Sequence, residues 1–147
     1  MKLRLMLGML GVYFLAGCAC CNTPSPSVFG SLPHQQIQKA LQDNPLGEKE
    51  NFKIVMLSKD SASSYHVVQI RGKERLHLHR WHGAKVLLWK GKGTLLLDGK
   101  SIALREGEEI QIPAGAPHAF TNQSADPAVA VVQFTPPFDG KDTQHLE

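Results

Sequence analysis

The chain has 147 residues with 16 basic and 13 acidic side chains, which gives a formal net charge of +3 at neutral pH. Two of these three charges come from Lys2 and Arg4 at the N-terminus, so the remainder of the chain carries only +1. No run of Lys and Arg with interleaved aromatic residues is present, and we therefore expect no nucleic-acid partner. The length allows one domain with one hydrophobic core.

The first 17 residues predict a secretory signal peptide. A short basic region precedes an uncharged, mostly apolar run over residues 5–16, which is shorter than the ~20 residues that a transmembrane helix needs. The run ends in Leu15-Ala16-Gly17-Cys18, which resembles the bacterial lipobox. This resemblance implies cleavage after Gly17 and lipidation of Cys18. Several acyl chains would anchor the protein firmly, because each buried methylene adds about 0.8 kcal/mol of membrane affinity.

The residues after the lipobox bear on location and on redox state. Ala19 occupies the position at which an aspartate would signal retention in the inner membrane. In a Gram-negative host we therefore expect the protein to be anchored in the outer membrane and to face the periplasm. All three cysteines lie here, and Cys20 and Cys21 could pair, cross-link two molecules or stay free. Residues 18–32 are rich in Pro, Ser, Asn and Thr and predict a lipidated, flexible tether.

Residues 33–44 predict one short helix. The apolar residues Ile37, Ala40 and Leu41 recur with helical spacing, and Pro33 suits a helix start. Asn44-Pro45 would end the helix. We expect it to pack on the outer face of the domain or to cover one end.

From residue 52 onward the apolar pattern has a period of two, with frequent turn signals such as Asp98-Gly99. Many short strands separated by turns favour an all-β sandwich or barrel. The predicted strands are 52–57, 65–71, 75–80, 85–90, 93–97, 100–104, 109–112, 118–121 and 128–135.

Two histidines on one strand suggest a metal site. His77 and His79 are two residues apart and therefore point to the same face of a strand. Neutral imidazole is a common ligand for zinc, copper, iron and nickel. A third ligand must come from elsewhere in the chain, and His118 is the candidate. Pro113 and Gly115 would form the tight turn before it.

The segments around these histidines resemble the two motifs of the cupin family. From Gly107 through Pro113, Gly115 and His118 to Asn122, the spacing G-x5-P-x-G-x2-H-x3-N matches the second motif position for position. The first motif is matched more loosely by Gly72, His77, His79 and Gly91. The resemblance covers residues 66–136. It implies a double-stranded β-helix (a jelly-roll barrel) within a single domain over residues 33–147, and a homodimer as a candidate assembly.

The first motif usually carries a glutamate, which is absent here. Its expected position is Ala84, or Gly83 with a shorter spacer. One interpretation is a site of three histidines. A second adds His82, as a fourth ligand or as a group that supports the ligands from behind. A third is a degenerate site with weak or no metal binding. The resemblance otherwise implies one divalent transition metal, either Fe, Mn, Ni or Zn.

Several further side chains are candidates for the barrel interior or its mouth. His66 and Gln69 have opposite strand parity, so only one of them is expected to reach the cavity. Trp81 and Trp89 are candidates for the pocket mouth or an interface, and packing in the core or at an interface is the commoner role of an aromatic residue. The lysines at 85, 90, 92 and 100 predict a solvated surface. The candidate lining residues are Val86, Leu88, Phe120, Val132 and Phe134.

The sequence leaves two functions open. The protein is either a mononuclear metal enzyme, dioxygenase-like or isomerase-like, acting on a small molecule, or a non-catalytic module that binds or senses a small ligand or metal. No acid or base beside the ligands is identifiable, so the sequence names no catalytic residue. Fold alone does not decide between them.

Overall fold

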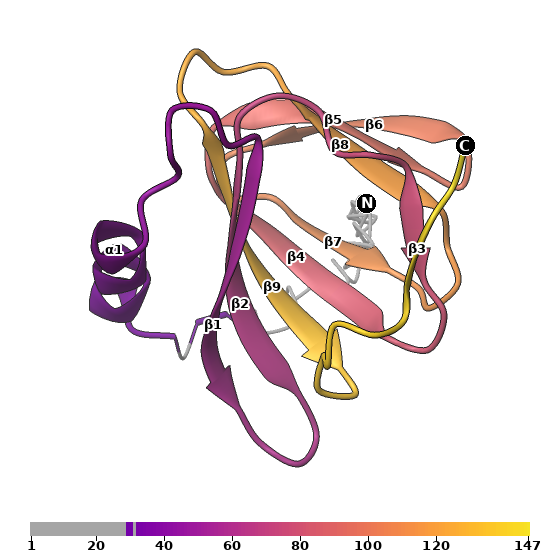
Figure 1. Ribbon diagram of the computed structural model, residues 1–147, viewed down its shortest axis with the longest axis horizontal. Coiled ribbons are helices and arrows are strands. Elements are labelled where there is room, and N and C mark those ends of the chain that lie inside the picture. Colours follow the sequence, from indigo (N-terminus) through magenta and orange to yellow (C-terminus); the bar gives the residue numbers. More distant parts are fainter. Residues whose placement is uncertain (1–28, 31) are drawn as a thin grey trace, which may run out of the picture.

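The computed structural model describes residues 29, 30 and 32–147. The predicted signal peptide, Cys18, Cys20, Cys21 and most of the predicted tether therefore lie outside the described residues. Among the described residues, no helix is both long and apolar enough to cross a membrane. Figure 1 shows a barrel of strands with one helix packed against its outside.

The described part of the chain forms one helix and ten strands. The elements are α1 (His34–Asp43), β1 (Phe52–Lys59), β2 (Ser64–Ile70), β3 (His77–His79), β4 (Gly83–Lys90), β5 (Lys92–Leu97), β6 (Lys100–Arg105), β7 (Glu109–Ile112), β8 (His118–Asn122), β9 (Ala128–Thr135) and β10 (Thr143–His145).

The strands form two five-stranded sheets that face each other (Figure 1). The strand order is β1-β2-β9-β4-β7 in the first sheet and β10-β3-β8-β5-β6 in the second. Every pairing between these strands is antiparallel. Strands that are neighbours in a sheet are mostly distant in sequence, which is the jelly-roll arrangement. The predicted fold class is therefore confirmed.

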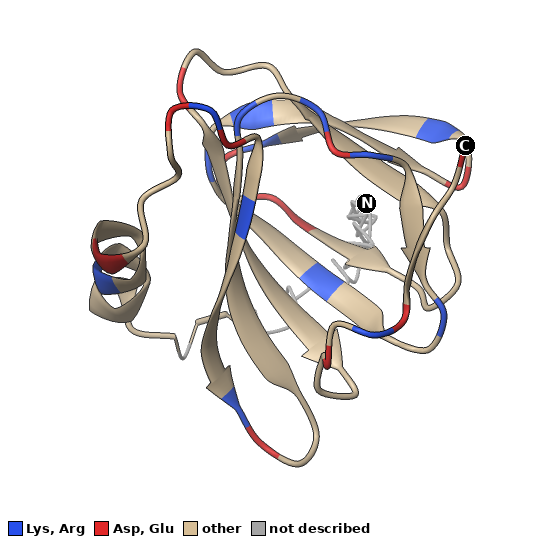
Figure 2. Cartoon of the chain, in the orientation of Figure 1, with Lys and Arg blue, Asp and Glu red and all other residues tan. Residues whose placement is uncertain are grey.

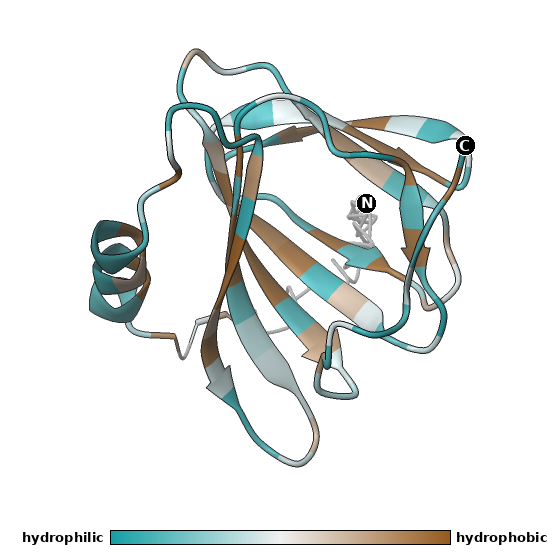
Figure 3. Ribbon diagram, in the orientation of Figure 1, coloured by the Kyte–Doolittle hydropathy of each residue, from teal (hydrophilic) through white to brown (hydrophobic). Residues whose placement is uncertain are grey.

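The two-residue period of the sequence explains which side chains face inward. On β9, Ala130 and Val132 belong to the core between the sheets, whereas Val129 and Val131 belong to a second apolar cluster on the outer face. Both faces of this strand are covered, so its sequence is an almost continuous apolar run. Figure 3 shows hydrophobic residues concentrated on the strands and hydrophilic residues on the loops.

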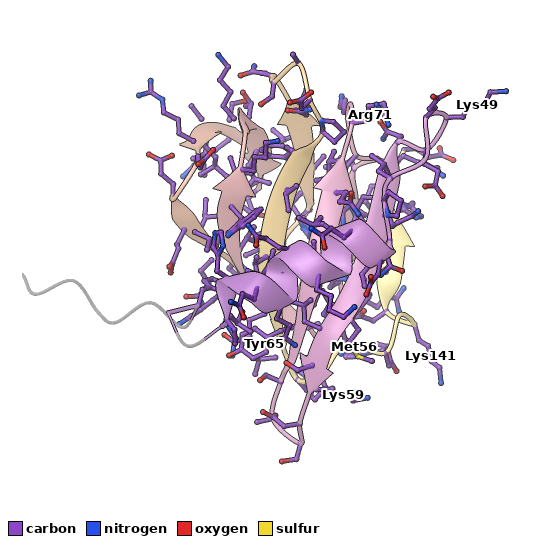
Figure 4. The ribbon with its side chains drawn as sticks, turned by 90° about the vertical axis from the view of Figure 1, so that its left-hand side faces the viewer. Lys49, Met56, Lys59, Tyr65, Arg71 and Lys141 are labelled. Atoms are coloured by element: carbon purple, nitrogen blue, oxygen red, sulfur yellow. The ribbon has the colours of Figure 1, made fainter. Side chains whose placement is uncertain are left out.

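Helix α1 supplies the cover for the outer face of the first sheet. Ile37 is buried against Val67 and Val131, and Gln36 Nε2 donates to the carbonyl oxygen of Leu57 at 3.1 Å. Figure 4 shows the helix lying across the strands, and the prediction that it packs on the outer face is confirmed. Phe29, within the predicted tether, is also buried in this cluster.

The structure departs from the predicted strands at two places. The strand predicted at 75–80 is only His77–His79, and β10 has no counterpart among the predicted strands. The residues before His77 do not form a regular ladder of backbone hydrogen bonds, because side chains take part in their hydrogen bonding. Asn51 Nδ2, for example, donates to Lys73 O at 2.8 Å. Strand β10 has three residues and pairs only with β3, so its formation depends on tertiary contacts rather than on a local pattern.

The polar and aromatic candidates divide between the two sides of the barrel. His66 contacts Phe134 and Phe138 inside, whereas Gln69 Nε2 donates to Asn44 O beneath the helix region, so only one of the two faces inward. Trp89 packs on the outer cluster. Trp81 is 54% exposed and is not core. The four lysines are exposed, and Figure 2 shows basic and acidic residues mixed over loops and strands.

A test of this packing is Gly93→Ala on β5. A Cβ at Gly93 would overlap the Phe120 ring and the carbonyl oxygen of Thr121, so strand or ring must shift. We expect a loss of about 1–3 kcal/mol in the free energy of unfolding, measured by urea denaturation. Gly83→Ala is the control, because the nearest atom to its Cβ lies 3.7 Å away, and it should change stability by no more than about 0.5 kcal/mol. Equal effects would contradict this packing.

Candidate metal centre

Three histidines from two adjacent strands meet at one end of the barrel. His77 on β3 lies directly opposite His118 on β8 in the strand register, and His79 follows two residues after His77 on the same face. The ring centroids are 4.3 Å apart for His77 and His118, 5.2 Å for His77 and His79, and 5.5 Å for His79 and His118. One nitrogen from each ring lies within 4.8 Å of the others. The structure therefore brings together the three histidines that the sequence singled out.

Hydrogen bonds to Nδ1 determine which nitrogen each histidine offers. His77 Nδ1 lies 2.8 Å from the carbonyl oxygen of Arg75, and His118 Nδ1 lies 2.9 Å from that of Ala116. A carbonyl oxygen only accepts hydrogen bonds, so each Nδ1 carries the proton. The Nε2 atoms keep their lone pairs, which is the state that a metal ligand requires. These side chains fit a divalent metal ion.

Burial favours the neutral form of His79 and His118. The pKa of His118 is lowered to about 4, chiefly by loss of solvent and also by the nearby His77 and His79, although the hydrogen bond with Ala116 O opposes the shift. Burial and the neighbouring His77 likewise lower the pKa of His79. His118 is therefore uncharged at neutral pH, and few protons compete with a metal ion for it.

Asp142 connects His79 to His82. Its Oδ1 lies 3.4 Å from His79 Nδ1, and its Oδ2 lies 2.6 Å from His82 Nδ1. Oδ2 also accepts from the backbone N–H groups of Trp81 and His82. Burial raises the pKa of Asp142, but the hydrogen bonds from His82 and Trp81 outweigh it and the net pKa is lowered. The hydrogen bond at His79 Nδ1 is with Thr143 Oγ1, at 3.3 Å, and the Asp142 carboxylate adds an electrostatic contact to the same ring nitrogen.

His82 is placed away from the three ligand nitrogens. Its Nδ1 faces Asp142 and its Nε2 lies 3.2 Å from the carbonyl oxygen of Pro137. His82, Asp139 and Asp142 form a separate group of potential ligands. Of the two roles that the sequence analysis considered for His82, this arrangement matches that of a residue that does not bind the metal but contacts the surroundings of a ligand, here through Asp142 beside His79.

The remaining motif residues shape the turns around the site. Gly115 has φ +79° and its N–H donates to the carbonyl oxygen of His79 at 2.7 Å, which ties the turn after Pro113 to β3. Asn122 Nδ2 donates to the carbonyl oxygens of Arg71 and Asp126. Gly91 and Gly107 also adopt positive φ, a conformation that side chains with a Cβ rarely adopt.

The histidines open onto a cavity of about 620 Å³ between the sheets. All five predicted lining residues line it, and so does the methyl group of Ala84. Ala84 is buried at the position where the first motif would place its glutamate. The cavity therefore receives no carboxylate from that position.

A carboxylate that the sequence analysis missed lines the same cavity. Glu74 Oε2 accepts from the backbone N–H of Phe120 at 2.9 Å, and Glu74 N–H donates to Phe120 O. Burial raises the pKa of Glu74 to about 7, although the hydrogen bond from Phe120 opposes the shift. The only local signal was its position three residues before His77, and the contact with Phe120 spans 46 residues.

The family comparison agrees with this geometry. The cupin domain family matches residues 64–134, which include the three histidines and the central strands of both sheets. None of the curated proteins matches the sequence.

Solved structures with the same fold include several proteins of low sequence identity. Pac13 from Streptomyces, a nucleoside dehydratase whose structures include uridine complexes, has 12% identity and a TM-score of 0.61, covering 73% of this chain and 88% of its own. KdgF from Halomonas has 18% identity and a TM-score of 0.59, covering 67% and 91%. TT1209 from Thermus thermophilus has 22% identity and a TM-score of 0.59, covering 69% and 95%. At these identities the likeness shows the fold alone.

The ligand assignment predicts different effects for two histidine variants. Elemental analysis of the purified wild type should find about one equivalent of metal. His118→Ala should lower metal affinity by more than about 100-fold, because it removes a ligand, whereas loss of a group behind a ligand costs about 10–100-fold. His82→Ala is the matched variant and should retain more metal. Equal retention by both variants would contradict the three-histidine site.

Proposed function

We propose, from the premise that the chain contains a cupin domain, that the protein is a metal-dependent enzyme that acts on a small molecule held inside the barrel. The observation that carries the proposal is the convergence of three histidines and one partly buried carboxyl group on a single cavity. The structural neighbours include an enzyme, the nucleoside dehydratase Pac13, which supports a catalytic role for such a barrel.

His77, His79 and His118 would hold the metal through their Nε2 atoms. A divalent iron, manganese, nickel or zinc ion bound there would supply Lewis-acid chemistry, or redox chemistry in the case of iron. Hydrogen bonds at Nδ1 orient all three rings, through Arg75 O for His77, Ala116 O for His118 and Thr143 Oγ1 for His79.

Glu74 is the group of this chain that could move a proton. A carboxyl group with a pKa near 7 is close to equally protonated and ionised at neutral pH, which is the condition for efficient general acid–base catalysis. Its Oε2 is held by Phe120 N–H, so the carboxyl group is fixed relative to β8 and to His118 on the same strand. We assign Glu74 the role of proton donor and acceptor for the bound molecule.

The alternative function is a non-catalytic module that binds a small ligand or metal. One observation favours it: Ala84 replaces the glutamate of the first cupin motif and leaves a methyl group in the cavity. Turnover distinguishes the two functions, because only the first includes it.

The deciding experiment loads the purified protein separately with Fe²⁺, Mn²⁺, Ni²⁺ and Zn²⁺ and measures product formation and O2 uptake over a panel of small molecules. We expect turnover with at least one metal, lost in His118→Ala. Tight binding of metal with no turnover for any metal form would establish the non-catalytic module instead.

Glu74→Gln tests the proton-transfer group without knowledge of the substrate. The pKa of Glu74 is about 7 in the folded protein, whereas a solvated glutamate has an ordinary pKa of 4.5. At pH values between these two pKa values, the folded protein therefore binds more protons at this group than the unfolded chain does. Raising the pH from about 5 to 8 should therefore destabilise the wild type through this group. Glu74→Gln keeps an acceptor for Phe120 N–H but cannot titrate.

The measurement is the free energy of unfolding at pH 5 and pH 8 for both proteins. The wild type should lose more stability than Glu74→Gln between these two pH values. Once a substrate is known, the ascending limb of the pH–rate profile near pH 7 should disappear in the variant. Identical changes in stability for both proteins would contradict the elevated pKa.

We also propose that the protein is anchored to the cell envelope through lipid on Cys18. The proposal rests on the Leu15-Ala16-Gly17-Cys18 sequence after an apolar run. Cys18→Ser should move the protein from the membrane fraction to the soluble fraction, as measured by fractionation and immunoblotting. Cys20→Ser is the control and should stay with the membrane. Unchanged membrane association of Cys18→Ser would count against lipidation.

A further inference from the structure

Apolar side chains make up most of the cavity lining. Both sheets contribute aliphatic and aromatic side chains, from β2, β4 and β9 on one side and from β5, β6 and β8 on the other. Protein interiors are normally packed without voids of this size, because a void costs its lining atoms their contacts. A cavity of about 620 Å³ lies in the range that small-molecule sites occupy. Its size and lining indicate an apolar ligand.

Alanines on adjacent strands create the space. Ala84 on β4 and Ala128 and Ala130 on β9 line the cavity, and each is buried. Their register partners include Phe134 and Val68, so small residues stand beside large ones on the inner face. Larger side chains at these three positions would fill the barrel.

Polar lining is confined to one side of the cavity. It comes from β3, β10, the first residue of β8 and the segments that contain Asn51 and residues 73–75. A sugar or nucleoside carries polar groups over its whole length, and each one left without a partner costs about 1–3 kcal/mol. The deep lining offers no polar side chain to meet them. The ligand therefore has its polar group at one end.

The charges at the polar side favour an acidic group. Lys73 and Arg75 line the cavity next to His77, and a bound divalent ion would add further positive charge. Glu74 is the one acidic residue among the described lining residues, and its raised pKa reduces its repulsion of an anion. A carboxylate group on the ligand could form ion pairs with these cationic side chains and could also bind the metal.

The apolar surface continues out of the barrel along β1. Phe52 and Ile54 line the cavity and are also 43% and 37% exposed, and Met56, on the same face of the strand, is 56% exposed. Figure 4 labels Met56 near the lower end of β1. An alkyl chain that extends beyond the cavity would therefore find further apolar side chains along this strand.

We propose that the barrel binds an alkyl carboxylate, with its chain in the apolar cavity and its carboxylate at the side of His77, His79 and His118. This inference rests on the proposed function, because it names the class of molecule that the same site takes. It distinguishes this chain from a binder of nucleosides or sugars.

Isothermal titration calorimetry of the purified Zn²⁺-loaded protein tests the proposal with hexanoate, octanoate and decanoate. Affinity should rise about fourfold for each added methylene, which corresponds to ~0.8 kcal/mol of burial. Decanol should bind more weakly than decanoate, and uridine should not bind. No dependence on chain length, equal binding of decanol and decanoate, or preference for uridine would each overturn it.

Two variants block the cavity and one serves as a control. Ala130→Phe and Ala84→Leu should each weaken decanoate binding by at least about tenfold while retaining the metal, whose content verifies that the barrel is folded. Ala103→Phe adds a ring at an exposed position of β6 and should leave binding unchanged. Unchanged decanoate binding in both metal-retaining cavity variants would overturn the proposal.

The outcome separates this inference from the proposed function. If decanoate fails to bind while the metal-loaded protein turns over another compound, only the alkyl carboxylate is wrong. If His118→Ala and the wild type both lack metal yet decanoate binds with the expected dependence on chain length, the ligand class stands and the metal-dependent function fails.

Discussion

The register between residues 71–79 and residues 115–122 is the constraint on which the site depends. His77 pairs with His118, and a slip of one residue would turn the histidines of one strand to the opposite face. The register is held on both sides of this pair. Gly115 N–H donates to His79 O, and Asn122 N–H donates to Gly72 O.

Glu74 belongs to the same set of constraints. It occupies a position where β3 would otherwise continue along β8, and it meets Phe120 with both its backbone N–H and its side chain. The carboxyl group thus replaces a ladder hydrogen bond, and the cost of burying it appears as a raised pKa. The carboxyl group that helps to set the register is thus also the one proposed to exchange a proton.

The two apolar clusters have different roles. The cluster beneath α1 is filled by side chains from the helix and from the outer face of β2 and β9, and it covers the outer face of the first sheet. The inner cluster lines the cavity and leaves space. Stability can therefore come from the outer layer, while the interior remains available for a ligand next to the histidines.

The sequence by itself determined the elements with strong local patterns. The two-residue period predicted most strands, and the spacing of His77, His79 and His118 with the turn residues between them predicted the site, because strand geometry places alternate residues on one face. The tertiary structure alone decided the rest. Asp142, Glu74 and β10 reach the site through contacts between residues 46 or more positions apart, and such contacts leave no periodic signal in the chain. Likewise, an alternating apolar pattern is the same for a filled and a hollow barrel, so only the packing of Ala84, Ala128 and Ala130 against their neighbours decided that this one has a cavity.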